Sequence, residues 1–211
     1  MAFRTLPDLQ YLSFDFTLQR YISQSESGGG LINTVEYADP RWTVDIETRG
    51  YSNNWQKNDD GLPSLDEIKA VWASLRGGMR SLLVRHPVYI CPRLNKDNPQ
   101  VAKTVGRLAK VENGNIITVT GLNASLRLSS GDYLTFQYND FRALGRAISA
   151  EFNPTGYLIE IEPKLPKYIT IGANVYFDRM ELIMRPMNDS FSISSGYPQR
   201  TAKFQLMESR Y

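Results

Sequence analysis

The stretch from Pro63 to Pro87 carries the strongest helix signal in the chain, and it constrains what the remaining residues can form. Ser64 followed three residues later by Glu67 is typical of a capping box, in which each side chain bonds the backbone amide of the other. Gly77 and Gly78 then favour a helix end, because glycine readily adopts the left-handed conformation found there. The apolar residues between these signals share one helical face: Leu65, Ile68, Val71, Trp72 and Leu75. The helix is therefore expected to cover a hydrophobic sheet.

The first third of the chain predicts strands for that sheet. Tyr11–Gln19 alternates apolar and polar residues with the period of a half-buried strand. A second strand is expected at Leu31–Tyr37 and a third at Arg41–Arg49, with Trp42, Val44 and Ile46 sharing one face. The residues between these two strands, Ala38, Asp39 and Pro40, are typical of a turn.

A second region, from about Val101 to Val175, alternates short strands with turn-forming residues. Even spacing of this kind predicts a small β-barrel. The expected strands are Leu108–Val111, Ile116–Thr120, Leu126–Leu128, Tyr133–Tyr138, Ala143–Glu151, Tyr157–Glu162 and Tyr168–Ile171.

The domain organisation follows from these two regions. The polar loop Arg93–Gln100 is the expected boundary, and strands at Val175–Met187 and Arg200–Ser209 are expected to return to the first sheet. We therefore predict a mainly β protein with one flanking helix. Residues 1–93 with 174–211 form a discontinuous outer domain, and residues 94–173 form an inserted small β-barrel.

Composition argues against several classes of partner. The net charge is +2 and no long basic run occurs, so nothing in the charge pattern favours sequence-specific nucleic-acid binding or an acidic membrane. Cys91 is the single cysteine and cannot form an internal disulfide. No stretch approaches eighteen apolar residues and the first ten lack the apolar core of a signal peptide, so we expect synthesis in the cytoplasm and no membrane insertion.

The sequence offers little support for catalysis, and we predict no catalytic residue, cofactor or metal. His86 is the sole histidine, and Cys91 lies an odd number of residues away along an expected strand, so the two side chains point to opposite faces. One histidine and one cysteine do not make a zinc site. Glu160 and Glu162 share a strand face and could form a glycosidase-type carboxylate pair, but a solvated face explains the same pattern.

Two polar loops supply candidate partner contacts. The first has three consecutive glycines but lacks the lysine and hydroxyl residue of a phosphate-binding loop, which indicates a surface loop. The second holds aromatic residues that could anchor a partner or fold back onto the core, and adjacent carboxylates without the spacing of a calcium loop. The candidate interface residues are Gly28, Gly29 and Gly30 in the first loop, and Tyr51, Trp55, Asp59 and Asp60 in the second.

Several motifs carry a resemblance to a known family. Pro40-Arg41-Trp42 precedes a polar stretch, then Leu62-Pro63-Ser64-Leu65-Asp66-Glu67-Ile68 and Trp72-Ala73-Ser74-Leu75-Arg76-Gly77. LSSGDYLTF, ALGRAI, GYLIEIEPKL and IGANVYF follow further along the chain. This succession resembles the distal tail proteins of tailed bacteriophages and covers most of the sequence.

The resemblance implies a β-sandwich or split-barrel domain like that of a tail tube protein, flanked by a helix. It also implies a non-enzymatic structural role in the virion tail, as a ring, usually hexameric, that joins the tail tube protein to the tail hub. DNA would pass through the lumen of such a ring, and the protein would be made in the cytoplasm of the bacterial host.

Two other functions stay open from the sequence. In the first, the barrel is a carbohydrate- or receptor-binding module whose aromatic residues stack on a sugar: Tyr133, Tyr138, Phe141 or Tyr157. In the second, Glu160 and Glu162 serve a cell-wall glycosidase. Core packing accounts for the same aromatic residues, and a solvated strand accounts for the same carboxylates.

Overall fold

The computed structural model is mainly β, and within its described residues it has one α-helix, a closed barrel and a separate sheet, which confirms the predicted fold class. The described residues are 4–6, 9–49, 51–52, 64–153, 156–194 and 199–210.

The chain divides into two compact units, and both are discontinuous. The barrel unit comprises Met1–Leu6 with Leu83–Ile183, and the sheet unit comprises Pro7–Leu82 with Met184–Tyr211. The sequence suggested boundaries after residues 93 and 173, whereas the compact units divide inside strands β5 and β12. The expected boundary loop holds two short 3-10 turns, η2 at Arg93–Asn95 and η3 at Pro99–Lys103.

The sheet unit is built on strands from both ends of the chain. Its order is β12-β15-β3-β2, with β13 also paired to β15, while β4 and β14 form a separate two-stranded ladder. The strands are β2 (Tyr11–Glu26), β3 (Ile32–Thr48), β4 (Tyr51–Ser52), β12 (Glu181–Pro186), β13 (Ser192–Ile193), β14 (Gln199–Arg200) and β15 (Ala202–Glu208). Trp42, Val44 and Ile46 are buried on one face of β3, as predicted.

Helix α1 (Leu65–Ser74) covers this sheet. The capping box is present, with the Ser64 backbone N–H donating to Glu67 Oε2 at 2.6 Å and the Glu67 N–H donating to Ser64 Oγ at 3.2 Å. Trp72 stacks on Phe191, with ring centroids 5.2 Å apart, and lies 5.3 Å from the ring of Phe204 on β15. The helix ends in a 3-10 turn, η1 (Arg76–Gly78), where Gly77 and Gly78 have positive φ. These features confirm the predicted helix and its ends.

The strand prediction for the first third of the chain is wrong in one respect. The expected strands at Leu31–Tyr37 and Arg41–Arg49 are a single strand, β3, that runs through the expected turn. The ladder with β2 shifts register around Tyr21, so the extra residues are absorbed as bulges. A proline is tolerated at such a place because it removes a ladder donor where pairing is already irregular. Another register shift, between Tyr11 and Ser13, leaves Leu12 exposed, although its alternation had placed it with the inward residues.

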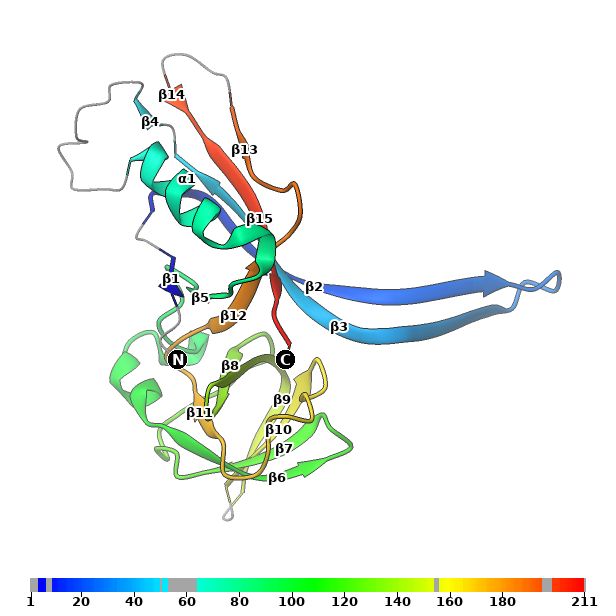
Figure 1. The fold of residues 1–211 in the computed structure, drawn as a ribbon. Coiled ribbons are helices and arrows are strands. Elements are labelled where there is room, and N and C mark those ends of the chain that lie inside the picture. The colour runs from blue at the N-terminus through cyan, green and yellow to red at the C-terminus, as the bar shows by residue number, and fades with distance from the viewer. Residues whose placement is uncertain are drawn as a thin grey trace. The chain divides into compact units, whose positions relative to one another are not determined.

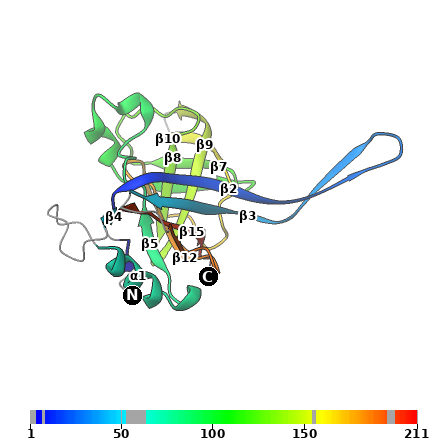
Figure 2. The same ribbon diagram turned by 90° about the horizontal axis from the view of Figure 1, so that it is seen from above.

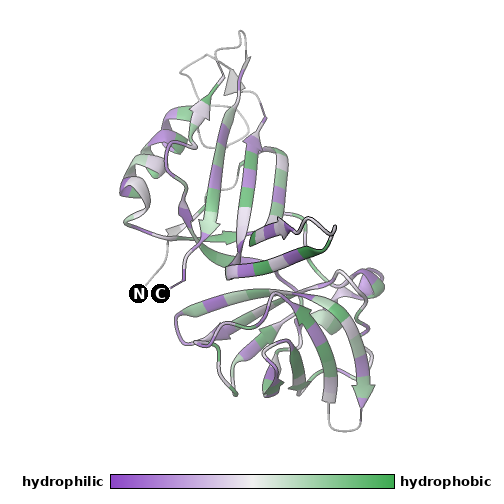
Figure 3. Cartoon of the chain, turned by 90° about the vertical axis from the view of Figure 1, so that its right-hand side faces the viewer, coloured by the Kyte–Doolittle hydropathy of each residue, from purple (hydrophilic) through white to green (hydrophobic). Residues whose placement is uncertain are grey.

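The barrel unit contains a closed antiparallel barrel of order β10-β7-β6-β11-β8-β9. A short ladder of order β1-β5-β12 belongs to the same unit. The strands not yet given are β1 (Arg4–Thr5), β5 (Leu82–Arg85), β6 (Gly106–Glu112), β7 (Ile116–Thr120), β8 (Tyr133–Tyr138), β9 (Phe141–Asn153), β10 (Gly156–Glu162) and β11 (Asn174–Tyr176). Figure 3 shows hydrophobic and hydrophilic residues alternating along many of these strands, as a filled barrel requires.

Two of the expected barrel strands are not strands. Leu126 is fully buried, but its backbone carbonyl accepts a hydrogen bond from the Tyr157 hydroxyl and makes no ladder. Residues 168–171 form turns, with the Ile169 N–H donating to Pro166 O at 3.0 Å. The sixth strand is instead β11, which pairs with both β6 and β8 and lies just past the boundary that the sequence suggested.

A buried carboxylate fastens the C-terminal strand of the sheet unit to β3. Glu208 Oε2 accepts from the Trp42 backbone N–H at 3.1 Å, and Glu208 Oε1 accepts from Arg210 Nε at 3.1 Å. The Glu208 side chain is 1% exposed. The Arg210 guanidinium also donates to the carbonyl of Pro40. We call these contacts of Glu208 the clasp. Because Glu208 is buried, removing its charge leaves the Arg210 guanidinium uncompensated, which costs more stability than breaking a surface ion pair.

We expect Glu208→Gln to lower the free energy of unfolding by about 3 kcal/mol, because the Arg210 cation then lies beside a neutral amide. Glu47→Gln is the matched control, since Glu47 pairs across the same sheet with an exposed lysine, Lys203. That change should cost about 1 kcal/mol or less. Urea denaturation of both variants measures the difference, and equal losses would contradict a structural role for the clasp.

Candidate functional site

The most distinctive surface in the described chain is the outer part of the β2–β3 hairpin. These strands pair all the way from Tyr11 to Glu26, but β15 pairs with β3 only between Thr43 and Glu47. Figures 1 and 2 both show the two strands extending well beyond the rest of their own sheet. Every residue from 22 to 39 is exposed. We call residues 22–37 the arm.

The three predicted loop glycines form the tip of the arm. The Ser27 N–H donates to Leu31 O at 2.9 Å, and the Gly30 N–H donates back to Ser27 O at 2.8 Å. The Leu31 N–H also donates to Ser27 Oγ at 3.2 Å. Gly30 has a φ of +77°, which glycine adopts without the strain that a side chain would bring. Gly28, Gly29 and Gly30 therefore make a closed hairpin turn, and the strand that precedes it continues as far as Glu26.

The arm carries apolar side chains on both faces. Cross-strand partners lie on the same face, so the pairs Ile22 with Glu36 and Glu26 with Ile32 define one face and the pair Ser23 with Val35 the other. Five large apolar side chains of the arm are between 44% and 72% exposed: Ile22, Leu31, Ile32, Val35 and Tyr37. Within the described part of the sheet unit, neither face has a third strand or a helix to cover it.

Such a ladder is unusual for a chain that stays alone in water. A two-stranded hairpin is marginally stable without a third strand or a packing partner. Both strands of the arm are edge strands, and natural proteins protect exposed edges with charges, prolines or coverings. An ion pair between Arg20 and Glu36 at 3.3 Å crosses the strands near the base of the arm, but the arm contains no proline. Its open edges and apolar side chains make the arm the candidate surface for contact with another polypeptide.

The second predicted interface loop lies almost entirely outside the described residues. The backbone of Tyr51 belongs to β4 and pairs with Arg200 of β14. Trp55, Asp59 and Asp60 fall outside the described residues, so their expected role stays a prediction.

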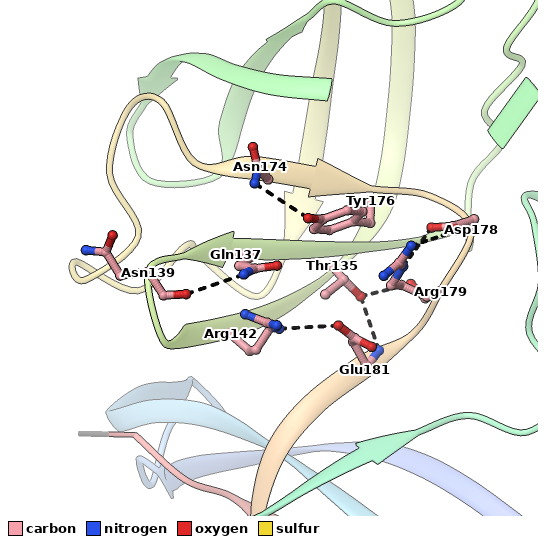
Figure 4. Close-up of polar contacts among 9 residues, drawn as sticks. All are labelled: Thr135, Gln137, Asn139, Arg142, Asn174, Tyr176, Asp178, Arg179 and Glu181. Carbon is pink, nitrogen blue, oxygen red and sulfur yellow. Dashed lines mark hydrogen bonds and ion pairs between the residues drawn. The ribbon is translucent and has the colours of Figure 1, made fainter. Parts of the chain in front are cut away.

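A polar cluster in the barrel unit fixes the chain segment that leaves the barrel after β11 (Figure 4). Thr135 Oγ1 on β8 donates to Arg179 O at 2.9 Å and accepts from the Glu181 N–H at 3.2 Å. Arg142 Nε lies 3.3 Å from Glu181 Oε1, and both side chains are largely buried. Sequence reasoning missed this cluster because its members are isolated polar residues on separate strands.

The same segment holds a second ion pair. Arg179 donates from two nitrogens to the Asp178 carboxylate, at 2.9 and 3.0 Å, and its guanidinium lies 4.4 Å from the centroid of the Tyr176 ring. Hydrogen bonding to Asp178 raises the pKa of Arg179, so this group stays cationic. These hydrogen bonds and ion pairs therefore hold the segment after β11 against strands β8 and β9.

His86 and Cys91, the residues considered for catalysis, lie in local environments that do not favour catalysis. His86 Nδ1 accepts from the backbone N–H groups of Val88 and Tyr89, at 3.2 and 3.1 Å, and so closes a turn. Cys91 is partly buried, and burial, followed by the nearby Asp132 charge, raises the pKa of its thiol and disfavours the reactive thiolate. In the described part of the chain, no group of three or more histidine, cysteine or acidic side chains could hold a metal ion.

Strand β10 alternates between buried and more exposed side chains. Tyr157, Ile159 and Ile161 are buried, while Glu160 is exposed and Glu162 is partly exposed. Glu160 Oε2 accepts a hydrogen bond at 3.5 Å from the hydroxyl of its cross-strand partner on β9, Ser149. The alternation therefore has the packing explanation that the sequence already offered.

The aromatic residues considered for sugar stacking are engaged in packing. Tyr157 is buried and donates to Leu126 O, and Phe141 lies 5.3 Å from the ring of Tyr168. Tyr133 meets the ring of Tyr89 edge-on at 5.6 Å and has the Arg146 guanidinium 4.9 Å from its centroid. Tyr138 packs against the barrel core. Packing contacts therefore account for all four residues, of which Tyr157 is buried and the other three are partly exposed.

Comparison with known proteins identifies no family model and no curated protein that matches this chain. Among the described residues, no helix has the length and apolar character needed to span a membrane.

We expect Thr135→Val to destabilise the barrel unit by about 2 kcal/mol, because the nearly isosteric valine leaves the Glu181 N–H without its acceptor. Thr118→Val is the matched control, since Thr118 lies on barrel strand β7 and its side chain has no hydrogen bond within the described chain. Thermal unfolding of the two variants checks the difference. A loss that is the same in both would assign the effect to the general cost of replacing a barrel threonine.

Proposed function

We propose that this protein is a structural, non-enzymatic ring component of a bacteriophage tail tip, and that its copies join through the arm. The observation that carries the proposal is the arm itself, a long two-stranded ladder with every residue exposed and apolar side chains on both faces. The resemblance of the sequence motifs to those of distal tail proteins supports the tail-tip assignment.

Docking onto another copy would bury the apolar side chains that the isolated arm leaves exposed to water. Fully burying a large aliphatic or aromatic side chain contributes about 1.5 to 3 kcal/mol, and the arm offers five partly exposed ones. Only part of that sum would remain as affinity, because association costs translational freedom and side-chain ordering. A few buried anchors of this kind are nevertheless sufficient to hold a specific interface.

The arm also suits a ring. In a ring the arm of one copy contacts a different surface of the next copy, because an arm that met only another arm would close a two-fold pair. Contacts between unlike surfaces are head-to-tail, and they close into a ring when the rotation between copies allows it. In the proposed assembly a hexameric ring lies between the tail tube protein and the tail hub, with the DNA path along its axis.

The protein would accordingly be made in the cytoplasm of the bacterial host and end in the virion tail. A carbohydrate-binding or glycosidase function has less support, because the aromatic residues and carboxylates on which it rests are used in packing or lie on an exposed strand face.

Shortening the arm should abolish assembly without unfolding the protein. Ile22 and Glu36 are cross-strand partners, so replacing residues 23–35 by Asn-Gly closes a two-residue hairpin at that register. We expect the intact protein to form rings visible by negative-stain microscopy and the shortened variant to sediment as a monomer. Circular dichroism and unfolding of the shortened variant should match those of the intact protein, because the arm contributes no buried residue to the core.

A conservative control keeps the arm and changes only polar cross-strand partners. Ser25 and Asn33 face each other, and Ser25→Thr with Asn33→Thr should preserve both the ladder and assembly. An intact protein that remains strictly monomeric at high concentration and in the presence of tail proteins would overturn the proposal.

A further inference from the structure

The barrel unit has an apolar hollow on its surface, with a volume of about 440 Å³. The turn between β6 and β7 forms one wall and the segment after Pro163 the other. The apolar lining residues are Val111, Leu165, Pro166, Ile169 and Ile171. Backbone hydrogen bonds hold the walls in place, with the Leu165 N–H donating to Gly114 O at 2.7 Å and the Gly172 N–H donating to Leu108 O at 2.8 Å.

The hollow combines an exposed apolar side chain with positive charge. Ile171, which belongs to its lining, is 64% exposed. Lys167 lines the hollow, and the Lys164 side chain lies against Gly114 in its wall. Both lysines are exposed, and neither has an ion-pair partner within the described residues. Glu112, an acidic residue of the adjoining strand β6, is already paired with Lys110.

The arm tip has the complementary properties. Leu31 and Ile32 are the two most exposed aliphatic residues of the arm, at 72% and 66%. Glu26 is the cross-strand partner of Ile32, so its carboxylate lies on the same face of the tip. Glu26 is exposed and has no ion-pair partner in the described part of the chain. The tip therefore presents Ile32 beside one negative charge, and the exposed Leu31 precedes Ile32 in the chain.

We propose that the arm tip of one copy binds in the apolar hollow of a second copy. Leu31 and Ile32 fill the hollow against Ile171, and Glu26 pairs with Lys164 and Lys167 at its rim. This inference rests on the proposed function, because it names the surface that receives the arm in the assembly. It assigns the barrel a role in the contact between copies.

Charge complementarity is the reason to select a second copy as the occupant. A tip without a carboxylate would bring Lys164 and Lys167 close to an apolar contact with no compensating charge. A hollow without lysines would leave Glu26 partly desolvated, and each case is unfavourable. Bringing the two surfaces together compensates both at once. The contact joins unlike surfaces, as the assembly through the arm requires.

Reciprocal charge reversal tests this contact directly. We expect E26K and K167E each to weaken self-association by about tenfold or more, as measured by sedimentation velocity, because each places like charges at the rim. A mixture of the two variants should regain assembly. In an alternating ring the lysine introduced by E26K meets the glutamate introduced by K167E. The unchanged Glu26 of the second variant then meets the unchanged Lys167 of the first, so every pairing between positions 26 and 167 is again between opposite charges.

Two further variants test the apolar part of the contact. Leu31→Ser and Ile171→Ser alter exposed side chains, so both proteins should fold normally while associating more weakly. Lys96→Glu is the charge control, since Lys96 is exposed, unpaired in the described chain and absent from the hollow. It should associate like the original protein.

The outcomes separate this inference from the proposed function. Assembly that is lost on shortening the arm but is insensitive to K167E and Ile171→Ser would overturn the hollow as the receiving surface and leave the arm-based assembly standing. Weakened variants that fail to regain assembly on mixing would also overturn the pairing of Glu26 with Lys167. An intact protein that never assembles would overturn both.

Discussion

The structure depends on where the pairing between β3 and β15 stops. Over Thr43–Glu47 the two strands share a ladder, and just beyond it the buried Glu208 carboxylate holds the Trp42 backbone and the Arg210 side chain. This pairing joins the N-terminal and C-terminal segments in one sheet and buries its apolar face under α1. Past Thr43 the described chain adds no third strand, so the same two strands that complete the sheet continue as the arm. The end of the β3–β15 ladder at Thr43 therefore separates the packed part of the sheet from the exposed arm.

An exposed arm risks pairing with the wrong chains, and its sequence lowers that risk. Polar residues separate its apolar ones, with Ser23, Gln24, Ser25, Asn33 and Thr34 between the aliphatic side chains. A continuous apolar strand of this length would pair indiscriminately with other chains. Interrupting it with polar residues lowers that tendency while a few anchors remain. This composition is typical of non-obligate interfaces, where overall hydrophobicity resembles the rest of the surface and a few residues supply most of the affinity.

Local signals predicted much of the fold but little of the candidate site. The capping box at Ser64, the glycines after α1 and the alternation in β10 each reflect interactions within one element, so they were legible in the sequence. The continuation of β3 through Pro40 was not, because a bulge tolerates the residues that usually mark a turn. The length of the arm was hidden for a related reason: where neither face is buried, the period-two pattern disappears. The hollow depends on β6, β7 and the segment before β11 meeting in space, which no local pattern encodes.

The two unlike surfaces of the proposed assembly also bear on why it would stop at a ring. In an open chain of copies joined tip to hollow, one arm and one hollow at the ends remain exposed, with their apolar residues and unpaired charges facing water. Closing the chain removes both ends in a single additional contact, and that contact costs less entropy than recruiting another copy because its partners are already held together. A closed ring is therefore favoured over a filament wherever the rotation between neighbours permits closure.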